Sequence, residues 1–201
     1  MTELKQEITT ENYDKTDPFG FLGTLSGTNL HFMNPHEDEI CLDDIANALS
    51  KNCRYAGQIN RFYSVAEHSV LMARYFIDKG EFQKAFTALM HDATEAYLVD
   101  VPRPIKPHLI GYLEMEERLM KVIFEKFNVQ PMCKDVKELD CHIVHDEAKV
   151  LFNSVPDWVK FYRSFGIELK CWTHEQAKSE FENTYHDLMG KLIFDLDIKE
   201  K

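Results

Sequence analysis

The stretch that decides the fold is Ala88–Pro104, with the sequence ALMHDATEAYLVDVPRP. It begins as an apolar helix and brings His91 and Asp92 side by side. Glu95 lies four residues after His91 and three after Asp92, so it shares a helix face with both. Burying an imidazole and a carboxylate costs free energy unless something pairs with them, and a divalent metal ion would do so. An exposed His-Asp pair at a helix end is the alternative, and the dipeptide alone does not separate the two.

Apolar residues recur at helical spacing on both sides of this stretch. This pattern predicts an all-α protein, a compact bundle of about six or seven helices. Asp43 or Asp44 is expected to cap the first helix, and Ser64 and Thr173 open capping boxes at two later ones. The expected helices cover about residues 44–52, 65–79, 82–98, 109–127, 135–152, 156–165 and 174–192.

The ends of the chain are expected to be less regular. Residues 1–17 are polar and are expected to be loosely ordered. Residues 19–32 contain three glycines and predict either a short hairpin or an irregular loop. The charged tail after Asp195 is expected to fray. With 201 residues and no internal repeat or linker, the chain is expected to form a single domain over residues 1–201.

Charge and cysteine content exclude several classes of protein. The net charge of −11 disfavours binding to nucleic acid or to an anionic membrane, although a metal ion and local cations would still admit a small phosphorylated ligand. No segment approaches the ~18 apolar residues of a membrane helix, and residues 1–12 do not resemble a secretory signal. The five cysteines are odd in number and form no C-x-x-C pair, which favours a reducing cytoplasm.

Two further helices carry residues that could complete a metal site. His68 lies three residues after Val65 on an apolar helix face, where a lone histidine is more often a core residue than a ligand. A second inward-facing His-Asp pair raises the odds that it is a ligand. The helix over residues 135–152 offers Asp140 and Asp146, both near its apolar face, and periodicity does not decide between them.

Taken together, these residues resemble the HD-domain phosphohydrolase superfamily. The match is closest to the small bacterial and phage 5′-deoxynucleotidases and deoxyadenosine-triphosphate hydrolases. It covers about residues 20–155, with a helical extension over about residues 156–194 that matches no family pattern. The stretches that carry the resemblance are residues 44–50, Arg54, residues 62–69, residues 91–106 and residues 136–140.

The resemblance implies a role for each matching residue. His68, His91, Asp92 and Asp140 would bind one divalent metal, and the run Lys137-Glu138-Leu139-Asp140 favours Asp140 over Asp146. Glu95 and Asp100 match the acidic pair that follows the doublet in the nucleotidases. Arg54 matches a basic residue that touches phosphate. In the bacterial deoxynucleotidases a Trp follows that basic residue, and here Tyr55 does, so the preference for base or sugar stays open.

The chemistry of these residue types supports the same function. Two imidazoles and two carboxylates suit Mn, Fe, Co, Ni or Zn, whereas Mg fits better as an additional ion on the phosphate. Such an ion would polarise a phosphoryl oxygen and lower the pKa of a water. Glu95 would orient or deprotonate that water, and Asp100 would act likewise, hold Arg54 or touch the sugar. Arg54, with Lys106 or Arg103, would offset phosphate charge, and Tyr55 would stack on a base or pack in the core.

The expected function is therefore a cytoplasmic, metal-dependent hydrolase of nucleotides or deoxynucleotides. A 5′-monophosphatase and a deoxynucleoside triphosphate (dNTP) hydrolase both fit, and the resemblance suggests nucleotide metabolism, for example in a phage, by analogy alone. A nucleotide-binding module without catalysis is the alternative of another class. An enzyme acting on cyclic dinucleotides ranks lower, because the GYP signature of those enzymes is absent. The expected partner is a small-molecule nucleotide, with no nucleic acid or membrane, and the chain could form a homo-oligomer.

Overall fold

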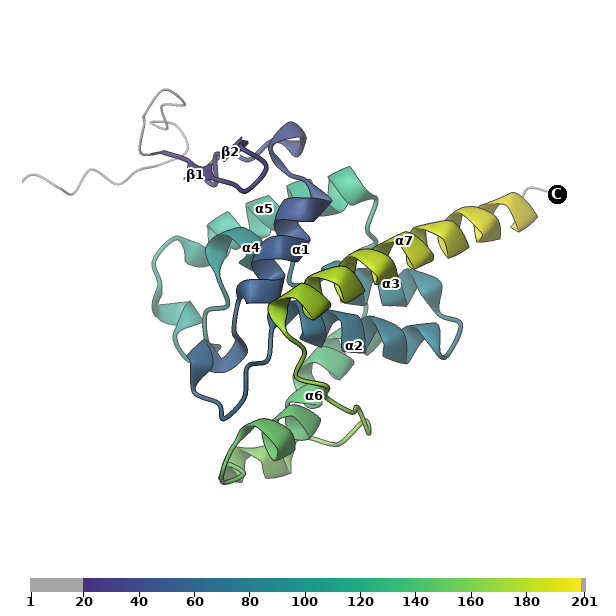
Figure 1. Cartoon of the computed structure of the whole chain (residues 1–201). Coiled ribbons are helices and arrows are strands. Elements are labelled where there is room, and N and C mark those ends of the chain that lie inside the picture. Colours follow the sequence, from purple (N-terminus) through teal and green to yellow (C-terminus); the bar gives the residue numbers. More distant parts are fainter. Residues whose placement is uncertain (1–19, 200–201) are drawn as a thin grey trace, which may run out of the picture.

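The computed structural model describes residues 20–199, and most of them are helical, which confirms the prediction of a compact all-α bundle (Figure 1). A two-stranded antiparallel hairpin, β1 (Leu22–Gly23) with β2 (Asn29–Leu30), stands beside the bundle. The α-helices are α1 (Leu42–Lys51), α2 (Val65–Ile77), α3 (Phe82–Met90), α4 (Glu95–Leu98), α5 (Tyr112–Phe127), α6 (Lys134–Leu151) and α7 (His174–Lys199). Short 3-10 helices are η1 (Glu37–Glu39), η2 (Arg54–Gly57), η3 (Lys106–His108) and η4 (Asp157–Phe161).

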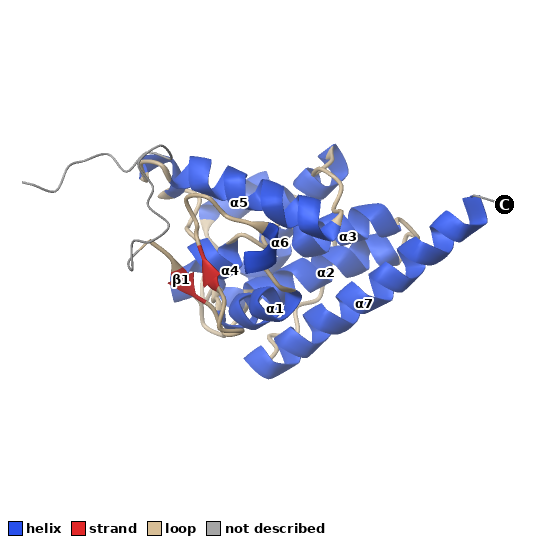
Figure 2. Cartoon of the chain, turned by 90° about the horizontal axis from the view of Figure 1, so that it is seen from above, coloured by secondary structure: helices blue, strands red, loops and turns tan. Residues whose placement is uncertain are grey.

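The core lies between α2, α3 and the helices that cross them. Gly80, with φ of +73°, turns the chain between α2 and α3, where a residue with a Cβ would be strained. Met72 and Phe86 from these helices are fully buried in the main apolar cluster. Phe181 and Leu188 of α7 belong to the same cluster, so the end of the chain helps to build the core. Figure 2 shows α7 running along the bundle and extending beyond it.

The predicted single helix over residues 82–98 was wrong. α3 ends at Met90, four residues turn, and α4 begins at Glu95. The amides of residues 93 and 95 donate to carbonyls three residues earlier, at 3.1 and 2.9 Å, which tightens this turn. The Nδ1 of the His91 ring donates a hydrogen bond to the carbonyl of Ala88, at 2.7 Å. In a continuing helix this carbonyl would accept from the amide of the next residue, Asp92. The side chain of His91 therefore competes with continuation of the helix.

The predicted helix starts were partly correct. Ser64 Oγ accepts from the Glu67 amide at 3.0 Å, as a cap should. The Glu67 carboxylate does not close the box, however, and instead binds the backbone amides of residues 170–172. At Thr173 both bonds of the predicted box are present, at 3.1 and 3.3 Å. The predicted cap at Asp43 or Asp44 was wrong, because Cys41 holds that position and Asp44 binds the Ser26 amide and hydroxyl.

The remaining boundaries differ modestly from expectation. Of the two alternatives for residues 19–32, the described part forms the hairpin of β1 and β2. The short helix expected over residues 156–165 is only the 3-10 turn η4. α7 continues to Lys199, past the expected end near residue 192, so the described part of the tail that was expected to fray is helical. The expectation for residues 1–17 falls outside the described residues.

None of the helices within residues 20–199 combines the length and the apolar character needed to cross a bilayer.

Candidate metal centre

Two histidines from different elements meet in the interior. His68 comes from α2, and His91 follows the last residue of α3. The centres of their rings lie 5.3 Å apart. His68 is 0% exposed and His91 is 5% exposed. Within residues 20–199, the Nε2 atom of each ring is buried and has no hydrogen-bond partner. Buried polar atoms are nearly always satisfied, so this pair of orphaned nitrogens points to a missing ligand.

The other ring nitrogens explain how the two imidazoles are held. His68 Nδ1 lies 2.6 Å from Glu147 Oε1, and His91 Nδ1 lies 2.7 Å from the carbonyl of Ala88. A carboxylate and a carbonyl can only accept, so each Nδ1 carries the proton when the ring is neutral. The lone pair of each Nε2 then faces the same space. Histidines that bind metals are usually oriented in this way.

Two carboxylates share this space. Asp92 Oδ2 lies 3.1 Å from His91 Nε2 and 3.7 Å from His68 Nε2. Asp140 Oδ1 lies 3.6 Å and 3.5 Å from the same two nitrogens. One ligand atom from each of His68, His91 and Asp92 lies within 4.8 Å of the others, so this group could hold a metal ion. Asp140 brings a further oxygen to the two imidazoles.

The electrostatics of these groups favour a bound cation. Burial opposes the charged form of His91, but Asp92 and Asp140 together raise its pKa well above the usual value. Burial likewise disfavours the Asp92 carboxylate, yet His91 lowers its pKa to about 2. The pKa of Asp140 is well below its usual range despite burial, because both imidazoles lie close to its carboxylate. A divalent cation would supply the positive charge that these carboxylates otherwise draw from protonated imidazole.

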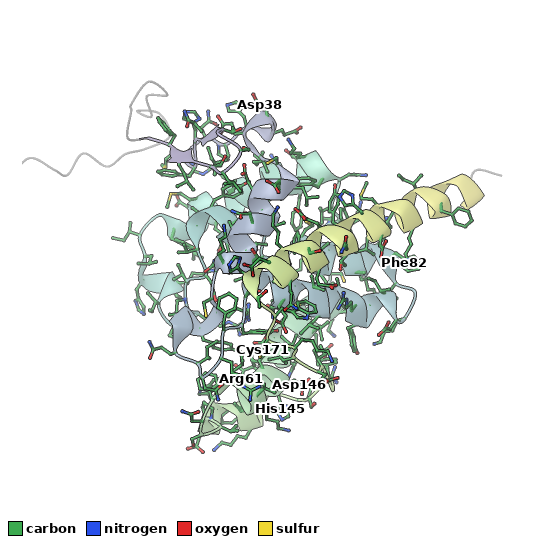
Figure 3. The ribbon with its side chains drawn as sticks, viewed as in Figure 1. Asp38, Arg61, Phe82, His145, Asp146 and Cys171 are labelled. Carbon is green, nitrogen blue, oxygen red and sulfur yellow. The ribbon has the colours of Figure 1, made fainter. Side chains whose placement is uncertain are left out.

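Asp146 has a different role. Its Oδ2 accepts from the amides of Phe165 and Ile167 at 2.9 and 3.0 Å, and its Oδ1 accepts from the Ser164 hydroxyl. Figure 3 labels Asp146 on α6, beside the segment that leads up to Cys171. Asp146 therefore fixes an irregular segment to α6 and does not face the two imidazoles.

Sequence reasoning missed Glu147, which is fully buried next to the metal site. Besides His68, it accepts from Tyr63 at 3.1 Å and from the hydroxyl of Tyr55, and Arg54 Nη2 lies 3.5 Å away. Burial alone would raise its pKa, but Arg54 and His68 lower that pKa to about 2. A signal existed, because Glu147 is two helical turns after Asp140 on an otherwise apolar face.

Arg54 joins the site from the loop before α2. A β-bridge between Cys53 and Ser64 closes this loop, and the Arg54 amide donates to the Tyr63 carbonyl at 3.0 Å. Tyr55, the next residue, is in the left-handed region with φ of +58°. The Arg54 guanidinium is 12% exposed and lies 3.5 Å from both Asp92 and Glu147. It therefore neutralises carboxylates of the site and still borders the adjoining cavity.

A cavity of about 490 Å³ opens beside this centre, a size typical of small-molecule sites. All the expected catalytic and substrate-binding residues reach it, together with two of the expected metal ligands. His68 and His91 are not among its lining residues. Residues lining the cavity are Arg54, Tyr55, Asp92, Glu95, Asp100, Val101, Pro102, Arg103, Pro104, Lys106, Asp140, Val144, Trp158 and Tyr162.

Glu95 is a buried carboxyl group in the lining of this cavity. It is 6% exposed, and its Oε2 has no hydrogen-bond partner in the described part of the chain. Burial, reinforced by Asp92 and Asp100, raises the pKa of Glu95 well above its usual value. The cations are less isolated, because Lys106 lies 2.6 Å from Glu116 and Arg103 lies 3.9 Å from Asp140. A carboxylate kept free to exchange a proton is what acid-base catalysis requires.

Comparison with known proteins places the chain in a family. It is 43% identical over 132 residues to Uncharacterized protein YfdR of Escherichia coli K12, covering 65% of this chain and 72% of YfdR. It is 36% identical over 137 residues to an uncharacterized protein of Rhodobacter capsulatus, covering 62% of this chain and 69% of that protein. No family model matches the chain. The chain therefore belongs to the same family as YfdR.

Proposed function

We propose that the protein is a metal-dependent phosphohydrolase of the HD-domain type that acts on nucleotides. The observation that carries the proposal is the pair of buried, unpartnered Nε2 atoms of His68 and His91 beside Asp92 and Asp140. Two imidazoles and two carboxylates suit Mn, Fe, Co, Ni or Zn. A bound ion of this kind supplies a Lewis acid for the phosphoryl group and a water of lowered pKa.

The residues of the cavity would then divide the work of hydrolysis. Glu95 Oε2 would accept the proton of the attacking water and later return it to the leaving oxygen. Asp100, which also lines the cavity, would orient the water or the sugar. Arg54 and Arg103 would stabilise the negative charge that develops on the phosphoryl oxygens. This assignment agrees with the depth at which Glu95 is buried.

The balance of charge favours a substrate with a single phosphate group. Arg54 already pairs with Asp92 and Glu147, and Lys106 pairs with Glu116, so few cations remain for a polyphosphate. The carboxylates that line the cavity would repel additional negative charge. They are Asp92, Glu95, Asp100 and Asp140. A 5′-nucleotidase is therefore the preferred form of the proposal, and a triphosphate hydrolase is the second form.

A product-resolved turnover screen tests the proposal. The protein is incubated with Mn, Co, Zn or Mg and each nucleoside mono-, di- and triphosphate, and the products are separated by chromatography. We expect metal-dependent release of phosphate from monophosphates. Glu95→Gln should lower kcat by about 100- to 10,000-fold and leave the metal content unchanged. Asp146→Asn is the matched control, because its carboxylate binds a loop and should leave kcat near that of the wild type.

Failure of the screen has a definite meaning. If no nucleotide is hydrolysed with any metal, the phosphohydrolase proposal is wrong. Nucleotide binding without turnover would then identify a binding module with the same site. Conversion of a triphosphate directly to a nucleoside would overturn the preference for monophosphates and keep the reaction class.

A further inference from the structure

Aromatic rings follow one side of the cavity. Tyr55 packs edge-on against Phe152 at 5.4 Å, Phe152 against Trp158 at 6.2 Å, and Trp158 against Tyr162 at 6.0 Å. We call these four rings the aromatic row. Tyr55, Trp158 and Tyr162 line the cavity, while Phe152 braces two of them. Edge-on packing is a favourable arrangement for aromatic rings and holds each ring in a fixed orientation.

Trp158 and Tyr162 differ from Tyr55 in what else they contact. The hydroxyl of Tyr55 is bound to Glu147, so this residue is committed to the buried network behind the metal site. Trp158 is 39% exposed although it is a large apolar side chain, and Tyr162 is half-buried. An exposed tryptophan at the mouth of a cavity is a frequent binding contact.

The segment that carries these two rings is held in place from both sides. Val159, between them in sequence, is 3% exposed. After Tyr162, the amide of Arg163 donates to His142 Nδ1 at 3.0 Å, and Asp146 binds the amides of residues 165 and 167. The rings are therefore preorganised, which reduces the conformational entropy lost when a ligand binds.

We propose that Trp158 and Tyr162 form the aromatic wall that packs against the nucleobase of the substrate, with one ring stacked on the base and the other, which is perpendicular to it, in contact at the edge. This inference deepens the proposed function, because it names the part of the same cavity that recognises the base. Arg54, two of the candidate metal ligands and the two rings all line this cavity, so aromatic surface borders the same space as the polar groups. Nucleobases stack on aromatic side chains with little dependence on sequence, since every base has a planar π face. A sugar phosphate without a base would leave this wall unused.

Intrinsic fluorescence isolates the wall, because the chain contains only two tryptophans, Trp158 and Trp172. Trp172 lies beside Arg74, 5.2 Å from ring centre to guanidinium, and does not line the cavity. In Trp172→Phe, Trp158 becomes the only tryptophan. We expect adenosine 5′-monophosphate and adenosine to change its emission saturably without added metal, and ribose 5-phosphate to leave it unchanged.

Substitution then measures the contribution of each ring. Trp158→Ala and Tyr162→Leu should each weaken binding of adenosine 5′-monophosphate by about 10- to 100-fold in calorimetry, because each removes an aromatic contact with the base. Binding of ribose 5-phosphate should be unchanged, and Trp158→Phe should restore most of the affinity. Trp172→Phe is the control and should bind like the wild type.

Two results would overturn the inference. One is an unchanged Trp158 emission at saturating adenosine 5′-monophosphate. The other is equal loss of affinity for adenosine 5′-monophosphate and ribose 5-phosphate in Trp158→Ala. Neither depends on turnover. If stacking depends on Trp158 while no nucleotide is hydrolysed, the wall stands and the hydrolase proposal fails. If base-free sugar phosphates are hydrolysed as well as nucleotides and Trp158→Ala binds and hydrolyses both like the wild type, the hydrolase proposal stands and the proposed wall is wrong.

Discussion

Replacing Glu147 by Gln should weaken metal binding although Glu147 would not touch the metal. The substitution keeps the shape of the side chain and removes a fully buried negative charge. The Glu147 carboxylate accepts a hydrogen bond from His68 Nδ1, with 2.6 Å between nitrogen and oxygen. It accepts another from the Tyr63 hydroxyl at 3.1 Å. Without it, the proton on His68 is no longer fixed to Nδ1, and the lone pair of Nε2 is less strictly aimed at the site.

The magnitude follows from these contacts. Loss of an outer partner of a metal-binding histidine typically costs about 10- to 100-fold in affinity, or about 1.4 to 2.7 kcal/mol. The buried Arg54 guanidinium, 3.5 Å from Glu147, also loses a partner. Breaking a buried ion pair costs about 3–5 kcal/mol, so we expect about 3 kcal/mol less free energy of unfolding, since Asp92 still pairs with Arg54.

Two measurements on metal-free and metal-loaded protein check this prediction. Competition with a chelating dye gives the dissociation constant for Mn or Zn, and urea denaturation gives the free energy of unfolding. Asp146→Asn is the matched control, since it makes the same chemical change one residue away on α6. It should lose about 2 kcal/mol of stability, because charged hydrogen bonds to backbone amides are removed, and bind metal like the wild type. Unchanged metal affinity in Glu147→Gln would refute the reasoning.

Three other perturbations give clear expectations. Asp140→Asn should lose more metal affinity than Glu147→Gln while keeping its helical circular dichroism, and normal metal loading would show that Asp140 is not a ligand. For pH, burial raises the pKa of Asp146, but its bonds to Ser164 and two amides lower it below 3.8 overall. Its stabilisation is therefore complete above pH 3.8 and is lost as the pH falls through the lower folded value. The stability difference between wild type and Asp146→Asn in urea should narrow only in that acidic range; a constant difference would contradict the assignment. Val99 has φ of +58° and ψ of 161°, which is strained for a β-branched residue, so Val99→Gly should raise the stability by about 1 kcal/mol, and a lower melting temperature would argue against that strain.

Helical periodicity predicted most of the fold because it depends on the burial of one face, which the sequence displays directly. It failed where a single side chain changed the backbone. The helix break after α3 depends on the His91 ring binding the Ala88 carbonyl, a contact that no apolar pattern contains. The 3-10 turn η4 packs on α6, a tertiary contact that the periodicity of its own sequence does not contain.

For the candidate site, residue types could be predicted from the sequence but their partners could not. Asp140 and Asp146 both lie next to apolar positions of α6. Six residues separate them, so their side chains point about 120° apart around the helix axis. Seven residues return a side chain to the same face, which is why Glu147 faces the histidine that Asp140 also faces. The two aromatic rings of the cavity wall, Trp158 and Tyr162, lie in η4 and directly after it, and this helix is too short for a repeat to mark the side chains that meet a cavity.

Two carboxylates bind the segment after η4, and this binding indicates how much of the chain is needed for folding. Glu67 holds the amides of residues 170–172, and Asp146 holds those of residues 165 and 167. A fragment ending near residue 155 would keep both carboxylates and lose every one of these donors, together with Phe181 from the core. We therefore expect that the stretch carrying the candidate metal ligands does not fold by itself. A gene fusion or truncation that kept only this stretch would separate these residues from the part of the chain that holds them in place.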